Sequence, residues 1–360
     1  MHFTRNRAAI AVTALLSVGS SVALADGPKL SDLLATSGLT ANGYVAASYF
    51  HSTETNAYHN YDIGHDSFQL DQAALTVAFQ PKQGFGAVVN VIAGEDARLQ
   101  NSFEDSSSRS SVDVLQAYAQ YATGNWTIIG GKFVTLAGAE VIAPTGNTNF
   151  SRSLLFAYEP SVHTGVRATY AVSDKLSVIV GANNGWNYTK TNYGSKTGEF
   201  GISLTPSKAF ALTAQTYIGK DPVFNASRKI VDLVGTFNAT DALSFVLSYD
   251  WGRQDSPVDS AADAKWSGLA GYVNAKLNPQ WRVSLRLEYL DDKDGFLTGA
   301  QQKLKEGTIT LGYAPADSFE LRLEGRYDKA PATTIASFSP LDSPFTDKQT
   351  ELAVQGVYKF

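Results

Sequence analysis

Histidine is the side chain in this sequence with the widest catalytic and metal-binding use. Of the five histidines, three fall in one polar stretch, at His51, His59 and His65. Imidazole is a common ligand of transition metals, but this spacing matches no established metal-binding signature. His163 stands apart, without a serine and an acid spaced as a hydrolase triad requires. We therefore expect no metal site, no cofactor and no enzyme activity.

The remaining composition narrows the chemistry further. The chain has no cysteine, which excludes disulfides, thiolate metal sites and cysteine nucleophiles. Its formal net charge is −5, and cleavage of an N-terminal leader would also remove two of its arginines. Because binding to a phosphate backbone needs a basic footprint, we expect no nucleic-acid partner.

Charged side chains recur at every second position of several apolar segments. In residues 281–290, Arg282, Arg286 and Glu288 alternate with apolar residues, and residues 319–328 repeat the scheme. Charges that line a water-filled interior set its ion preference through their local field. Since both signs alternate here, we expect weak selectivity and neutralisation between adjacent strands. The candidate pore-lining charges are Lys132, Arg167, Glu199, Asp232, Arg282, Arg286, Glu288, Glu320, Arg322, Glu324, Arg326 and Glu351.

The elements that must position these charges are β-strands, because side chains with a period of two lie on opposite faces of a strand. The alternating segments are about ten residues long, which is the length that a tilted strand needs to cross a bilayer. Aromatic residues fall toward the predicted strand ends, where they would form interfacial girdles. These aromatic residues are Phe50, Phe79, Phe85, Trp126, Phe210, Trp251, Trp266, Trp281, Phe319 and Phe360.

Connections between the predicted strands are sorted by length. Seven short turns alternate with eight longer polar stretches, which predicts sixteen strands with both chain ends on the short-turn side. An outer-membrane barrel has this arrangement, with short periplasmic turns and long extracellular loops. We therefore predict an all-β fold, a closed antiparallel transmembrane β-barrel of about 16 strands. The predicted long loops are residues 51–66, 98–111, 136–161, 187–196, 220–227, 252–264, 291–303 and 329–346.

Both ends of the chain agree with export to a bacterial outer membrane. Residues 1–25 combine two arginines, an apolar run and a small-residue cleavage pattern, which predicts a cleaved signal peptide before a single barrel domain at 26–360. At the other end, Tyr358 and Phe360 are expected in the lipid-facing row of the last strand, which closes on the first. A terminal phenylalanine after alternating apolar residues resembles the signal that the barrel-assembly machinery reads. These two residues are therefore the candidate assembly signal, and that machinery is a candidate partner.

Residues 131–187 contain a group of short segments: Gly131-Lys132-Phe133, Gly138, Glu140, Phe150-Ser151, HTGVR at 163–167 and NNGW at 183–186. On these segments the chain resembles the OmpL-like family of β-barrel porins. The resemblance implies an outer-membrane channel of Gram-negative bacteria in contact with outer-membrane lipid. It implies little about the solute, and it leaves self-association into a homo-oligomer open.

The longest predicted loop, residues 136–161, is the third external one. In general porins a long third loop folds into the lumen and narrows it. The apolar run at 154–156 suits packing on the inner wall, because its exposure to water would cost about 25 cal/mol per Å². A hairpin above the rim or a subunit contact is the alternative. The candidate constriction residues are Glu140, Arg152, Leu154, Leu155, Phe156 and Glu159.

Three functions remain open from the sequence. The first is a passive diffusion channel for small hydrophilic solutes and ions, in which Glu140, Arg152 or Glu159 would face Arg167, Arg286 and Arg322 across water. The second is a solute-specific channel for a sugar or for an anion such as phosphate, which a ladder of arginines would bind. The third is a closed barrel with an adhesive or structural role through its loops. We expect the first, because acidic residues interrupt the ladder.

Overall fold

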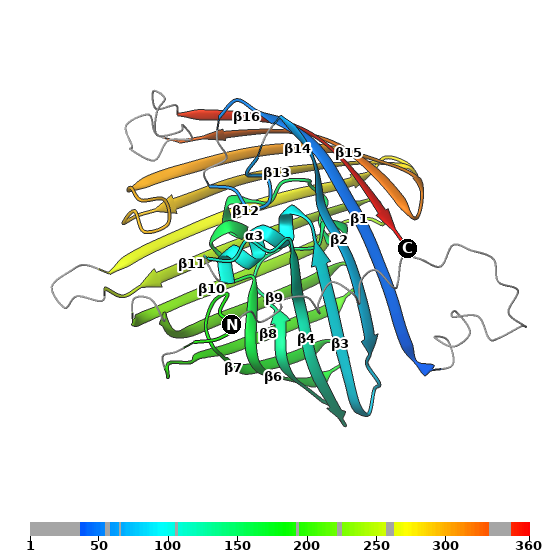
Figure 1. Ribbon diagram of the computed structural model, residues 1–360, viewed down its shortest axis with the longest axis vertical. Coiled ribbons are helices and arrows are strands. Elements are labelled where there is room, and N and C mark those ends of the chain that lie inside the picture. The colour runs from blue at the N-terminus through cyan, green and yellow to red at the C-terminus, as the bar shows by residue number, and fades with distance from the viewer. Residues whose placement is uncertain are drawn as a thin grey trace, which may run out of the picture. The chain divides into compact units, whose positions relative to one another are not determined.

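The computed structural model describes residues 37–54, 58–64, 66–104, 107–191, 194–221, 225–256, 263–330 and 347–360. The predicted signal peptide, residues 1–25, lies outside this part of the chain. Sixteen antiparallel strands close into one barrel, which confirms the predicted fold class (Figure 1). Their bounds are β1 Leu39–Ser52, β2 Ser67–Phe79, β3 Gly84–Ala93, β4 Val112–Thr123, β5 Trp126–Val134, β6 Val162–Ser173, β7 Leu176–Asn183, β8 Thr197–Ser207, β9 Phe210–Asp221, β10 Ala226–Asn238, β11 Leu243–Gln254, β12 Ala264–Lys276, β13 Trp281–Asp292, β14 Gln302–Ala316, β15 Phe319–Lys329 and β16 Lys348–Lys359.

Backbone hydrogen bonds between the first and last strands close the barrel. β1 pairs with β16 in antiparallel register, with Tyr44 opposite Lys359. Beyond that register, Gly43 and Phe360 exchange N–H···O bonds of 2.9 Å in both directions. The terminal residue is therefore part of the sheet, and each strand has a partner on both sides, as hydrocarbon surroundings require.

Apolar side chains at alternate positions form the outer face of the barrel. Leu287 and Leu323 are 58% and 55% exposed, whereas Arg322 on the opposite parity is 2% exposed. Tyr358 and Phe360 lie on the outer face as well, 50% and 64% exposed. The strands therefore have the two faces that the alternation in the sequence predicts.

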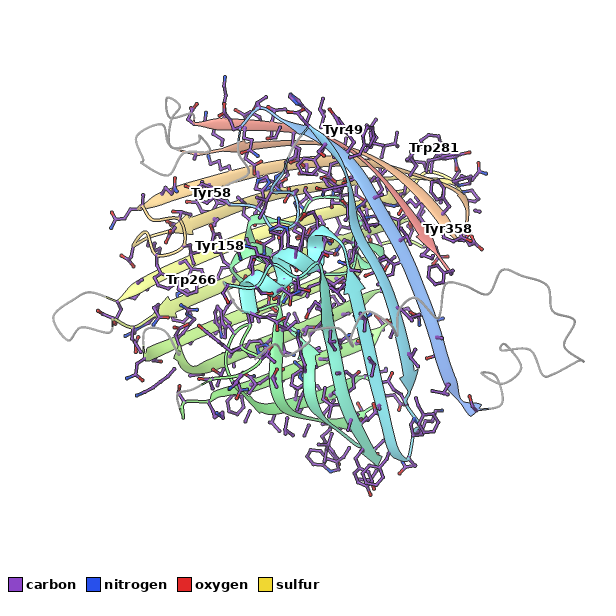
Figure 2. All side chains as sticks on the ribbon, viewed as in Figure 1. Tyr49, Tyr58, Tyr158, Trp266, Trp281 and Tyr358 are labelled. Atoms are coloured by element: carbon purple, nitrogen blue, oxygen red, sulfur yellow. The ribbon has the colours of Figure 1, made fainter. Side chains whose placement is uncertain are left out.

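Aromatic pairs mark the short-turn end of the outer face. The ring centroids of Trp126 and Tyr170 lie 4.7 Å apart, and those of Trp281 and Tyr313 lie 4.6 Å apart. Trp281 and Tyr358 appear at the same end of the barrel in Figure 2. This arrangement is typical of an interfacial girdle.

Two residues that were predicted to join the girdles face inward instead. Phe50 and Trp266 are only 1% and 2% exposed. Phe50 contacts Phe150 at 5.6 Å between ring centroids, and Trp266 stacks on Phe296 at 5.6 Å. The prediction was wrong for these two because it used only nearness to a strand end, whereas the parity of a residue along the strand decides its face.

Among the described residues of the long connections, three short segments are helical: α3 Glu95–Glu104, the 3₁₀ turn η1 Pro144–Gly146 and α4 Leu154–Tyr158. α3 contacts β2, β3 and β4 and packs Ala97 against Ile92 and Leu115 on their lumen-facing side. Sequence reasoning assigned most of α3 to a polar loop. In the described part of the chain, no helix has the length and apolar composition of a membrane-spanning segment.

Candidate functional site

The connection between β5 and β6, residues 135–161, packs against the inner face of the barrel and is called the third loop below. Its two ends meet, because the N–H of Thr135 donates to the carbonyl of Ser161 at 3.0 Å. The N–H of Leu136 donates to the hydroxyl of Tyr217 in β9 at 3.1 Å. From this base the loop extends to the far wall, where it contacts lumen-facing side chains of β12 to β15.

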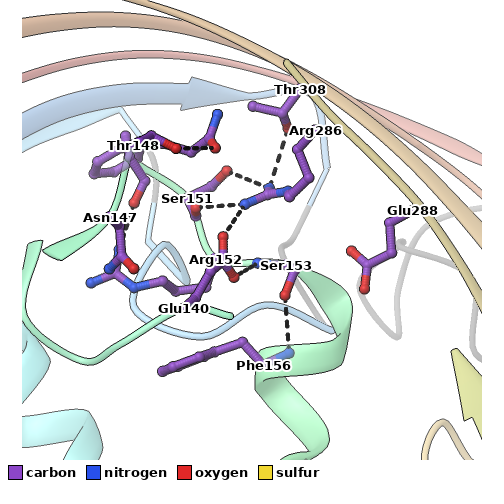
Figure 3. Close-up of polar contacts among 12 residues, drawn as sticks. Glu140, Asn147, Thr148, Ser151, Arg152, Ser153, Phe156, Arg286, Glu288 and Thr308 are labelled. Atoms are coloured by element: carbon purple, nitrogen blue, oxygen red, sulfur yellow. Dashed lines mark hydrogen bonds and ion pairs between the residues drawn. The ribbon is translucent and has the colours of Figure 1, made fainter. Parts of the chain in front are cut away.

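A carboxylate on the wall holds the short helix α4. Glu288 in β13 accepts hydrogen bonds from the N–H groups of Leu154 at 2.7 Å and Leu155 at 2.5 Å. The hydroxyl of Ser153 accepts a bond from the N–H of Phe156 at 3.1 Å and caps the same end (Figure 3). The first N–H groups of a helix lack partners within the helix and carry partial positive charge. Glu288 satisfies two of them and so fixes α4 to β13.

Arg286, two residues before Glu288, joins the same strand to the middle of the loop. Its guanidinium donates to the Glu140 carboxylate at 2.8 Å, to the Ser151 carbonyl at 2.8 Å and to the Ser151 hydroxyl at 3.0 Å (Figure 3). On the strand side it bonds Glu306 at 3.2 Å. Arg286 is fully buried, so the ion pair with Glu140 is direct and is not made across water.

Two residues of β15 bond the backbone of the loop. Glu324 accepts bonds from the N–H groups of Phe150 and Ser151 at 2.6 and 2.9 Å. Arg326 donates to the carbonyl of Arg152 at 2.7 Å. Charge-assisted bonds of this kind are roughly twice as strong as neutral ones, so the wall fixes the path of the loop and not only its ends.

Arg152 stabilises the third loop through hydrogen bonds to carbonyl groups of the loop itself. Its guanidinium donates to the carbonyls of Val141, Ile142 and Phe150 at 3.1, 2.7 and 2.7 Å. It also lies 5.9 Å from the ring centroid of Phe156. Sequence reasoning placed this side chain among the residues that face the wall arginines across water, whereas the structure directs it toward the loop's own carbonyl groups.

The apolar run of the loop packs on the wall. Leu154 and Leu155 are 0% and 2% exposed and join Ala270 of β12 and Leu290 of β13 in one apolar cluster. Gly268 of β12 leaves space for this contact, because a Cβ there would lie 2.1 Å from the Leu155 side chain.

Phe156 turns to the opposite side. It packs with Ile92 of β3, Leu115 of β4 and Tyr61. Tyr61 lies in the connection between β1 and β2, which is called the first loop below. The third loop is therefore held by apolar contacts on two sides of the barrel.

The other predicted lining charges also lie on the inner face, and most of them are paired. Arg167 contacts Glu199 at 2.8 Å, and Arg282 and Arg322 contact Glu320 at 2.5 and 2.9 Å. Arg282 and Glu320 keep 21% and 17% of their side-chain surface exposed, so this pair is among the more accessible of the lining charges. The alternation of signs that the sequence shows thus becomes charge compensation on the wall.

Two further external segments share the inner face, and sequence reasoning missed both. In the first loop, the Nδ1 of His59 lies 2.8 Å from Asp62 and its Nε2 lies 3.4 Å from Asp328 of β15. Burial and the Arg326 cation oppose protonation of His59, but the two carboxylates outweigh them and raise its pKa to about 9. The second of these segments contains α3, whose Glu104 pairs with Lys132 of β5 at 2.7 Å.

The inward position of the first loop had a signal in the sequence. Tyr58 and Tyr61 flank His59, and two aromatic rings close together indicate packing rather than a fully solvated loop.

Three predicted residues lie in clusters of acidic side chains, one of which also contains His59. Glu159 at the end of the third loop lies with Asp232 of β10 and Asp250 of β11, away from the arginines that were expected to face it. Glu351 of β16 lies with His59 and Asp62 of the first loop.

Two hollows lie on opposite sides of the third loop. The outer hollow, about 300 Å³, is lined on the external side by residues that include Glu159, Trp186 and Trp266. The inner hollow, about 470 Å³, is lined by Gly138 and neighbouring loop residues and by strand residues such as Asn42 near the short-turn end. The loop thus divides the interior into an external and a periplasmic part.

Comparisons with known proteins agree with this architecture. A family model described as "Putative beta-barrel porin-2, OmpL-like" matches residues 38–360. The outer membrane channel DcaP of Acinetobacter baumannii has a TM-score of 0.61 at 15% identity, over 89% of this chain and 97% of that one. The anion-selective porin from Comamonas acidovorans has a TM-score of 0.61 at 10% identity, over 89% and 99%. OprB of Pseudomonas putida has a TM-score of 0.60 at 12% identity, over 91% and 96%. No curated protein matches the chain.

Proposed function

Because the chain belongs to the OmpL-like family of β-barrel porins, we propose that it is a passive diffusion channel for small hydrophilic solutes and ions, narrowed by its third loop. The chain is a porin of the bacterial outer membrane. Its family and its fold are those of channels rather than enzymes.

The observation that carries the proposal is the attachment of the third loop to the inner wall. Glu288, Arg286 and Glu324 bond it at 3.0 Å or less, and a hollow remains on each side of it. A solute that crosses the barrel would pass from the outer hollow to the inner hollow beside this loop. The width and charge of that passage would then select solutes.

The pairing of the wall arginines supports weak selectivity over an anion-specific channel. Each arginine of the candidate ladder lies within 3.0 Å of a carboxylate oxygen, and these arginines are Arg167, Arg282, Arg286, Arg322 and Arg326. A specific anion would have to compete with these carboxylates for the same guanidinium groups. The series of arginines suggested a phosphate channel in the sequence. Their pairing with carboxylates supports a structural role for most of them instead.

Single-cysteine modification tests the proposal, because the chain has no cysteine of its own. Thr145→Cys places a thiol in the lining of the inner hollow. Leu287→Cys places one on the lipid-facing surface, where the native side chain is 58% exposed, and serves as the control. In planar bilayers a charged methanethiosulfonate added on the short-turn side should lower the conductance of the first variant and leave the second unchanged. Absence of stepwise conductance from folded wild-type protein would reject the channel.

The outer hollow favours a second candidate function, retention of ring-bearing solutes such as sugars. Trp186, Tyr158 and Trp266 contribute to its lining, and aromatic rings are the usual apolar contact surfaces of ligand pockets. Conductance should then fall in a saturable way as a sugar is added, and Trp186→Ala should weaken the effect. If conductance instead changes linearly with the concentration of every sugar tested, this candidate function is rejected.

A further inference from the structure

Three carboxylates form a cluster where the third loop returns to the wall, and we call it the acidic cluster. One oxygen from each of Glu159, Asp232 and Asp250 lies within 4.8 Å of the other two. The three residues are only 7%, 0% and 2% exposed. Asp232 and Asp250 are cross-strand partners on β10 and β11, and Glu159 reaches them from the loop. Carboxylates this close and this buried need a compensating partner or must lose their charge.

The described part of the chain supplies no such partner. None of its ion pairs includes a member of the acidic cluster, and the buried Arg286 pairs with two other glutamates. Both carboxylate oxygens of Asp232 and Oδ1 of Asp250 lack a hydrogen-bond donor. The N–H of Gly138 faces Asp232 but falls outside hydrogen-bond geometry. Three fully buried carboxylate oxygens of the acidic cluster therefore have no donor within hydrogen-bond geometry, and one oxygen of each residue lies within 4.8 Å of the others.

From this geometry we propose that the acidic cluster binds one divalent cation and that calcium fits it best. All the available ligand atoms are oxygens, which Ca²⁺ and Mg²⁺ prefer and softer transition metals do not. Calcium accepts irregular sets of carboxylate oxygens at about 2.3–2.6 Å, whereas Mg²⁺ demands a near-ideal octahedron and keeps several waters. Ser248 lies two positions before Asp250 on the same face of β11, and its hydroxyl is also buried without a partner among the described residues.

The position of the cluster gives the cation a function in the channel. Glu159 lines the outer hollow and Gly138 lines the inner one. The two residues touch, because a Cβ on Gly138 would lie 1.9 Å from the Glu159 carboxylate. A cation bound here would tie both ends of the third loop to β10 and β11 between the two hollows. It would also remove much of the negative charge that a permeating cation meets there, so calcium should lower cation conductance.

Proton sharing among the carboxylates is the competing arrangement. Burial and the neighbouring Asp250 and Asp232 carboxylates raise the pKa of Glu159 well above its usual range. A cluster held together by protons alone would bind no calcium at neutral pH. A measurement of calcium binding therefore distinguishes a cation site from a cluster of carboxylates that share protons.

Calorimetric titration of the folded protein with CaCl₂ tests the site. Protein refolded into detergent from inclusion bodies avoids lipopolysaccharide, which itself binds divalent cations. We expect one site with a Kd of about 10⁻⁴ M, the range of extracellular calcium modules, weaker binding of MgCl₂, and a rise in Tm with calcium. Asp232→Asn together with Asp250→Asn should abolish binding. Asp174→Asn in an exposed short turn makes the same chemical change away from the cluster and should leave binding unchanged.

Absence of calcium binding to the folded wild-type protein would overturn the proposal, and so would binding that survives in the double variant. If the double variant does not fold, Glu159→Gln provides the same test, because it leaves both strands unchanged. The titration needs no conductance measurement. Its result therefore tests the cation site independently of whether the protein forms the proposed channel.

Discussion

At the scale of residues, a few buried carboxylates decide where the third loop lies. Glu288 and Glu324 each accept two backbone N–H groups of the loop at 2.5–2.9 Å. An N-cap residue usually accepts hydrogen bonds from the first N–H groups of the helix that follows it. For α4, the carboxylate of Glu288 on a neighbouring strand also accepts such bonds. The same residues that sequence reasoning assigned to a water-filled lumen act as anchors in the structure.

Replacing Glu288 by Gln should loosen α4 without removing any volume from the wall. The amide offers one acceptor oxygen where the native side chain uses two, so we expect a loss of about 1 kcal/mol in the local opening free energy of α4. Amide hydrogen exchange at residues 154–156 should then become roughly fivefold faster. Glu320→Gln is the matched control, since Glu320 contacts arginines and not α4. Equal exchange rates in both variants would remove Glu288 from this role.

His59 should make the barrel's stability depend on pH. Its pKa is raised from 6.5 to about 9, so its protonated form favours the folded state. That contribution is fully present below the unfolded value of 6.5 and is lost as the pH rises through about 9. The Tm difference between wild-type protein and His59→Gln should therefore shrink between pH 7 and pH 10. A difference that stays constant over this range would contradict the assignment.

At the scale of elements, the third loop needs a groove on the wall to receive its apolar run. Gly268→Val should displace Leu155, because even a Cβ at this position would lie 2.1 Å from that side chain. We expect faster proteolysis within residues 136–161 and an unchanged strand content by circular dichroism. Gly235→Val in β10 is the control, since a Cβ there meets no atom within 4 Å. The same proteolysis in both variants would show that Gly268 does not position the loop.

The elements also show what the sequence could and could not predict. Alternation gave the strands and their faces, because one side of each strand must be apolar to meet lipid. It failed for α3, which is short and mostly polar, with acidic Glu95 and Asp96 in its first turn as the main sign of a helix. The run at 154–156 predicted packing on the wall, but the partners of Glu140 and Glu159 depend on register between distant strands, which a single sequence does not specify.

At the scale of the whole molecule, Phe360 takes part in the pairing of β1 with β16 that closes the barrel. Phe360 exchanges two backbone bonds with Gly43 and points to the lipid side. We propose that Tyr358 and Phe360 are read during assembly, so Phe360→Ala should lower the amount of heat-modifiable, folded protein in the outer membrane of cells. Phe68→Ala, which removes an 85% exposed ring from the lipid face of β2, should have a smaller effect. Equal losses in both variants would reduce the role of Phe360 to lipid contact.

Single-channel conductance of a variant that lacks residues 145–157 tests the central claim that the third loop sets the passage. The deletion removes α4 except for its last residue, together with the segment that Glu324 binds, and it leaves all sixteen strands intact. Heat-modifiable mobility on a gel would establish that the variant is folded before its channels are measured. The account predicts higher conductance and weaker ion preference than in the wild-type protein. Unchanged conductance in the folded deletion variant would place the third loop outside the route of permeation and contradict the account.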